Sequence, residues 1–166
     1  MIQEAFQYTR NIINQYITNK YGLDGTPVIA NKIVDQSGAI PLESQNKVIL
    51  SLIHVEQETS KPFYNRNINR SEGDSVVSSP PEAYNIYMLV TSCFDDYNET
   101  LKFLDASIQF FQMYPSLDKS NSASIPDSIQ KVTFEKQVEG GYAQMHNLWT
   151  AIGAKYQTSV VYKMRV

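Results

Sequence analysis

Cysteine and histidine are scarce in this chain, with one cysteine and two histidines among 166 residues. A single cysteine leaves no partner for an internal disulfide or for a cysteine-based zinc site. Cys93 stands inside the apolar stretch MLVTSCF, where we expect a buried, unreactive thiol with a raised pKa. His54 and His146 are far apart and belong to no metal-ligand spacing, so we expect both to be structural residues with satisfied hydrogen bonds. The sequence therefore predicts no metal site.

The usual signatures of catalysis are missing as well. The loop serines stand outside any G-x-S-x-G context, and the pair Gly140–Gly141 is not followed by the Lys-Ser/Thr of a phosphate-binding loop. Glu56 and Glu58 share one face of a predicted strand, but that strand leaves the sheet toward a polar loop, so we expect solvated carboxylates there. We predict that the protein is not an enzyme and has no catalytic residue and no cofactor.

Other absences restrict the partners and the location. The sequence has no run of Lys or Arg and a net charge of −3, which argues against nucleic acid as a partner. No apolar stretch approaches the roughly 20 residues that a membrane-spanning helix needs. The N-terminal residues carry Glu4 before any basic residue and contain no apolar core, unlike a signal peptide. We expect synthesis in the cytoplasm without a signal peptide, and departure from the cell only as part of a larger particle.

Strand patterns are the strongest feature that the sequence does contain. The segments 47–58 (KVILSLIHVEQE) and 83–94 (AYNIYMLVTSCF) are apolar on both faces, which is typical of central strands. Alternation predicts a half-exposed strand at 131–138, with Val132, Phe134 and Val138 on its apolar face. Residues 27–34 form either a strand or a loop.

A second alternating strand is expected to run to the last residue of the sequence. Its core-like face and its more polar face are, respectively, Tyr156, Thr158, Val160, Tyr162 and Met164, and Gln157, Ser159, Val161, Lys163 and Arg165.

Helical spacing of apolar residues predicts helices at residues 2–20, 95–113 and 142–152. In the second helix the predicted buried stripe is Leu101, Leu104, Ile108 and Phe111, and in the third we expect Trp149 to fill the core. The order of elements predicts an α/β (α+β) fold, with a single mixed β-sheet flanked by helices in one domain over residues 1–166. A polar segment at about 59–81 is longer than an ordinary connection and is expected to be a long loop.

Three stretches of this sequence resemble a known family. They are NKVILSLIHVEQE, then PPEAYNIYMLVTSCFDDYNETLKFLDASIQFFQMYPSL after the polar loop, and finally LWTAIGAKYQTSVVYKMRV. Together they are similar to the cap, or tail-terminator, proteins of extracellular contractile injection systems. These systems are phage-tail-like particles of the antifeeding-prophage and Photorhabdus virulence cassette type. The resemblance covers nearly the whole chain, and its C-terminal part is the most specific.

The resemblance implies a structural role and a tail-terminator-like fold. Such proteins form a hexameric ring that closes the distal end of the inner tube and the contractile sheath and ends their growth. The implied partners are further copies of the chain, the inner tube protein and the sheath protein. Two alternatives stay open, which are another structural ring subunit of the head–tail joining type and a small-molecule-binding α/β domain.

Two regions are candidate assembly contacts under this hypothesis, and eleven tyrosines are consistent with a protein-binding surface. The first is the long loop, with Phe63, Tyr64, Arg66 and Arg70, which is otherwise a disordered surface loop. The second is the polar face of the terminal strand, with Lys163 and Arg165, although core packing alone also explains that strand. We expect substitution of Lys163 and Arg165 by Glu to weaken assembly and to leave folding intact.

Overall fold

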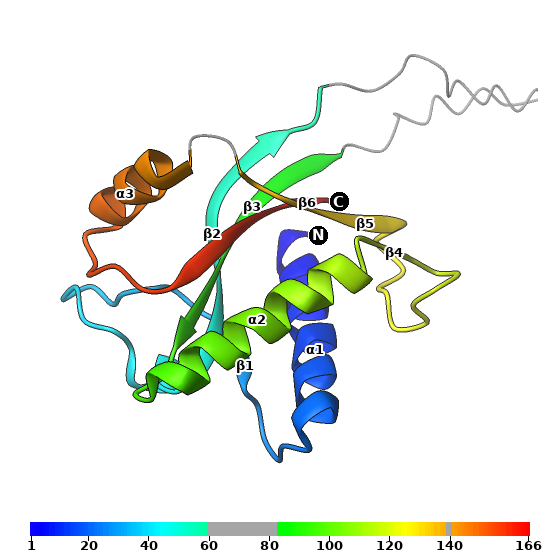
Figure 1. The fold of residues 1–166 in the computed structure, drawn as a ribbon. Helices are drawn as coiled ribbons and strands as arrows, with labels where there is room; N and C mark the ends of the chain where they lie inside the picture. Colours follow the sequence, from blue (N-terminus) through cyan, green and yellow to red (C-terminus); the bar gives the residue numbers. More distant parts are fainter. Residues whose placement is uncertain (60–82, 139–140) are drawn as a thin grey trace, which may run out of the picture.

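A computed structural model describes residues 1–59, 83–138 and 141–166 (Figure 1). Within these ranges the chain forms three α-helices, one short 3-10 helix and six strands. Their bounds are α1 Ile2–Tyr21, β1 Val28–Ala30, η1 Leu42–Ser44, β2 Lys47–Gln57, β3 Tyr84–Cys93, α2 Tyr97–Met113, β4 Ser116–Asp118, β5 Lys131–Lys136, α3 Gly141–Ile152 and β6 Ser159–Arg165.

The six strands form one mixed sheet in the order β1-β2-β3-β6-β5-β4. β1 runs parallel to β2, and every other neighbouring pair is antiparallel. β6 lies between β3 and β5, since Arg165 is opposite Asn85 on one side and Thr133 on the other. The sheet curls along its strands, and helices flank it (Figure 1). The predicted fold class is confirmed.

The two faces of the sheet have different covers because side chains alternate along each strand. On one face, α1 and α2 pack over the main core, to which the strands contribute Val48, Leu50, Ile86, Met88, Val90, Val132, Phe134, Val160, Tyr162 and Met164. On the other face, α3 packs over a smaller cluster built on Ile33, Leu89 and Trp149. Trp149 therefore fills a core, as predicted, but it is the core on the α3 side.

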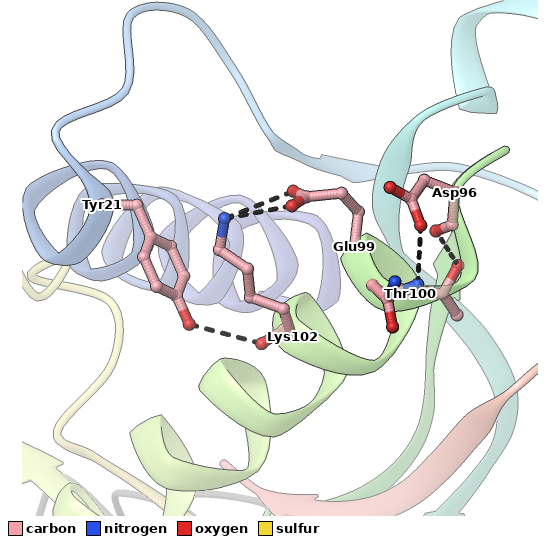
Figure 2. Close-up of polar contacts among 6 residues, drawn as sticks. Tyr21, Asp96, Glu99, Thr100 and Lys102 are labelled. Carbon is pink, nitrogen blue, oxygen red and sulfur yellow. Dashed lines mark hydrogen bonds and ion pairs between the residues drawn. The ribbon is translucent and has the colours of Figure 1, made fainter.

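The N-terminus of α2 is held by a conventional cap and by the end of α1 (Figure 2). The Asp96 carboxylate accepts the Asn98 backbone N–H at 2.8 Å, and the Asp96 carbonyl accepts the Thr100 N–H at 3.0 Å. One turn further on, the Tyr21 hydroxyl of α1 donates to the carbonyl of Lys102 at 3.4 Å. These contacts fix both the start and the rotation of α2.

The predicted buried stripe of α2 is largely wrong. The buried apolar residues are Phe103, Ala106, Phe110 and Phe111, whereas Leu101 is 43% exposed and Leu104 and Ile108 are half-buried. Both sets satisfy helical spacing, and ring packing explains the difference. Phe103 stacks on Phe94 with centroids 4.5 Å apart, and Phe111 stacks on Tyr162 at 4.0 Å. Burial of the larger aromatic rings stabilises the fold more than burial of leucine at the same positions.

The strand predictions also need correction at their ends. Val138 is 72% exposed because β5 ends at Lys136, and Tyr156 is 64% exposed because β6 begins only at Ser159.

β4 was not predicted, since three residues are too short to show alternation. β3 is central along its whole length, but β1 covers only residues 48–50 of β2.

Tyr162 makes the stability of this core sensitive to alkaline pH. Its side chain is buried, and burial raises the pKa of Tyr162 to about 12. Because the folded state favours the neutral phenol, the stabilisation is complete below the ordinary value of about 10 and is lost as the pH rises toward 12. We expect Tyr162→Phe to match the wild type at neutral pH and to retain more stability between about pH 10 and pH 12. Urea unfolding at neutral and alkaline pH measures this, and equal alkaline losses in the two proteins would contradict it.

Candidate interaction surface

In the described part of the chain, no helix covers the other end of the sheet face on which α3 packs. There, two rows of side chains cross four strands in register. We call these eight residues the polar platform; the first row is His54, Tyr87, Lys163 and Glu135, and the second is Glu56, Asn85, Arg165 and Thr133. Seven of the eight are exposed or half-exposed, and Asn85 is buried. The platform thus lies on the side of the sheet opposite the main core.

A hydrogen-bonded network holds the second row in place. The Arg165 Nε lies 3.1 Å from the Glu58 Oε2 and donates to the Asn85 Oδ1 at 3.2 Å. The Asn85 amide donates in turn to Glu58 at 3.0 Å and to Glu56 at 3.4 Å. The Tyr87 hydroxyl donates to Glu56 at 2.8 Å. These side chains brace β2, β3 and β6 against one another.

The expectation of solvated carboxylates at Glu56 and Glu58 is therefore wrong for Glu58. Its side chain is only 13% exposed, and it contacts the side chains of Arg165 and Asn85. Glu56 is 41% exposed and keeps contact with solvent. Sequence reasoning missed this pairing because Glu58 and Arg165 are far apart in the chain.

The two predicted terminal-strand residues lie on the platform but differ in their surroundings. Arg165 is engaged by Glu58 and Asn85, so part of its role is structural. Lys163 is half-exposed, with its Nζ 5.9 Å from the Tyr87 ring centroid. Among the residues that the structure describes, no carboxylate forms an ion pair with Lys163. Within the described residues, Lys163 is therefore the basic side chain of the platform that has no carboxylate in ion-pair contact.

The other predicted contact region, with Phe63, Tyr64, Arg66 and Arg70, lies outside the described residues. Its flanking residues are described, and they join the platform end of the sheet. The Glu58 N–H donates to the carbonyl of Ala83 at 2.9 Å, which ties the end of β2 to the start of β3. The segment that links β2 to β3 therefore starts and ends beside the platform.

The histidines and the cysteine of the sequence take no part in the polar platform's second row, and their surroundings differ. His54 and His146 are both exposed, and the His54 ring packs on the Tyr87 ring with centroids 5.5 Å apart. Burial, with a smaller contribution from Asp95, raises the pKa of the half-buried Cys93 thiol. Within residues 1–59, 83–138 and 141–166, no three His, Cys, Asp or Glu side chains lie close enough to hold a metal ion. No helix in the same ranges is both long and apolar enough to cross a membrane.

Fold and surface together define an α+β domain with a mixed sheet, helices on both faces and a braced polar platform at one end. Residues 7–166 match the Pvc16 N-terminal domain family. The chain belongs to this family, that of the N-terminal domain of Photorhabdus virulence cassette protein 16, and is thus related to structural proteins of contractile injection systems. A comparison with curated protein sequences gives no significant match.

Proposed function

We propose that this protein is the cap, or tail terminator, of a phage-tail-like contractile injection system. In this proposal six copies form a ring that closes the distal end of the inner tube and the contractile sheath and stops their growth. The family match over residues 7–166 carries the proposal. Its partners are other copies of itself, the inner tube protein and the sheath protein, with no role for nucleic acid, membrane or catalysis. The protein is made in the cytoplasm and leaves the cell within the particle.

The geometry of the sheet is consistent with such a role. A closed ring of identical subunits needs the same rotation at every interface, which requires rigid contact elements. The platform has this rigidity because its second row is hydrogen-bonded across β2, β3 and β6. From Val161 to Arg165 the backbone of β6 is paired with β3 on one side and with β5 or the residue after it on the other. The terminal strand therefore offers a neighbour its side chains, not its backbone edge.

Deletion of the gene is the direct test of termination. We expect particles without the protein to lose their uniform length, because nothing closes the growing end of tube and sheath. Electron micrographs of purified particles give the length distribution, and complementation with the wild-type gene is the control. Unchanged tube and sheath lengths would contradict the terminator mechanism.

Two further measurements separate the alternatives. A ring elutes near six times 18.9 kDa or co-purifies with particles, whereas a small-molecule-binding domain has no reason to do either. Reconstruction of the particle end distal to the baseplate should show the ring there. Density at a head–tail joint instead would favour the joining-ring alternative.

A further inference from the structure

The outer edge of β2 is only partly occupied. β1 pairs with β2 from Val48 to Leu50, and this pairing ends at Asn31, whose N–H still reaches the Leu50 carbonyl at 3.1 Å. β2 itself continues to Gln57. In the described part of the chain, no strand pairs with the outer edge of residues 52–57. An unpaired edge of this length is a template for another strand.

The pattern of hydrogen bonds shows which backbone groups face this open edge. The Val48 N–H donates to the Pro27 carbonyl and the Leu50 carbonyl accepts from the Asn31 N–H, so the backbone groups of even-numbered residues up to Leu52 point to the β1 side. An irregularity between Leu52 and His54 then shifts the alternation by one residue. The Glu58 N–H donates to the carbonyl of Ala83, the residue before β3. Because backbone direction alternates along a strand, the backbone groups of Glu56 and His54 also point to β3. The backbone groups of Val55 and Gln57 therefore face outward.

A groove of about 560 Å³ lies beside this edge, and its lining includes residues 50–53 of β2 and residues 30–34 at and after the end of β1. Leu52, which is 49% exposed, and Ile53 form its floor. Phe6 of α1 lines one wall, and Leu148 and Ile152 of α3 line the other. A strand laid in this groove would direct alternate side chains to the two apolar walls.

Charge adds a second requirement on any strand that continues past the groove. The Glu56 carboxylate is 41% exposed and accepts hydrogen bonds from two neutral donors, Tyr87 and Asn85. Among the described residues no lysine or arginine forms an ion pair with Glu56, and the His54 Nε2 lies 3.9 Å from the Glu56 Oε2. A lysine or arginine beside Glu56 on an added strand would complete a cross-strand pair of opposite charge.

We propose that the open edge of β2 binds an extended segment of another protein subunit of the particle as an added strand. This segment carries apolar side chains at successive positions along the groove and a basic side chain that faces Glu56. The inference rests on the proposed function, because it takes the partner from the particle end that the protein closes. The outward backbone groups of Val55 and Gln57 form part of that contact.

Amide hydrogen exchange tests the proposal at single residues. In the free protein the outward N–H groups of Val55 and Gln57 should exchange fast, whereas those of His54 and Glu56 are protected by β3. In purified particles we expect exchange at Val55 and Gln57 to slow by at least about tenfold, with His54 and Glu56 as internal controls.

Each other result of the exchange experiment has a definite meaning. Unchanged exchange at Val55 and Gln57 in particles that contain the protein would overturn this inference and leave the proposed function standing. Protection that is already present in the free monomer, or that appears when the free protein self-associates, would also overturn it. If the protection appears on self-association, a further copy of this chain occupies the edge. Absence of the protein from particles would overturn both proposals.

A proline substitution gives an independent measurement. Val55→Pro removes an outward N–H without breaking the β2–β3 ladder, and proline is tolerated at such edge positions. Relative to Val55→Ala, which matches the loss of side-chain packing, we expect incorporation into particles to fall about tenfold. Incorporation equal to that of Val55→Ala, with both variants folded by circular dichroism, would overturn the proposal. If Val55→Pro does not fold, the exchange measurement on wild-type protein decides.

The basic side chain has its own test. Glu56→Gln keeps the acceptor for Tyr87 and Asn85 but removes the charge, so we expect a smaller loss of incorporation that diminishes at high salt. If Glu56→Gln is incorporated at low salt as well as the wild type, the proposed segment has no basic side chain that faces Glu56.

Discussion

Replacement of Trp149 by alanine is expected to lower the free energy of unfolding by about 3–5 kcal/mol. Trp149 is the one buried residue of α3, and it packs with Ile33 and Leu89 under that helix. Its indole N–H also donates to the Ser159 hydroxyl at 3.3 Å. A helix of twelve residues is marginal by itself, so it stays folded only while its apolar side is docked. Urea denaturation followed by far-ultraviolet circular dichroism measures the change.

Tyr142→Ala in the same helix is the matched control for Trp149→Ala. Tyr142 is 88% exposed, and we expect its removal to change stability by no more than about 0.5 kcal/mol. A loss below about 1 kcal/mol for Trp149→Ala would show that other contacts suffice to dock α3. Because α3 forms one wall of the groove beside β2, undocking should also weaken incorporation into particles.

Arg165→Glu is expected to lower the free energy of unfolding by about 1–3 kcal/mol. The substitution places a second carboxylate beside Glu58, which is only 13% exposed, and removes the donor to Asn85. The Arg165 side chain is 48% exposed, so solvent screening keeps the cost below that of a fully buried pair. Urea denaturation is again the measurement. Wild-type stability of Arg165→Glu would show that the ion pair is screened and contributes little.

Lys163→Glu is the control for Arg165→Glu on the same strand and the same face. Lys163 has no ion-pair partner among the described residues, and its cross-strand neighbour Glu135 is exposed. We expect a stability loss of no more than about 1 kcal/mol from the new like-charge pair. Under the proposed function its main effect is weaker incorporation into particles. From these contacts we now expect replacement by Glu to leave folding intact for Lys163 but not for Arg165.

The candidate surface could be predicted from the sequence only in part. Alternation along the last strand correctly placed Lys163 and Arg165 on one face, away from Val160 and Tyr162. It could not show that Arg165 is already paired, because Glu58 and Asn85 come from other strands. The open edge of β2 was also beyond reach, since its apolar pattern continues past the point where β1 ends.

Local chemistry along the chain determined which elements form. The apolar runs of β2 and β3, the helical spacing in α1 and the Gly22 that ends α1 in a left-handed conformation are all readable without coordinates. The mixed sheet with flanking helices follows from the order of these elements.

Tertiary structure alone decided how the elements meet. The insertion of β6 between β3 and β5, the rotation of α2 onto its phenylalanine face and the pairing of Glu58 with Arg165 join residues that are distant in sequence. For each of these three features, the sequence periodicity alone would also permit another strand neighbour, helix face or side-chain partner. Strand pairing and ring packing select among them through contacts that exist only in the folded chain.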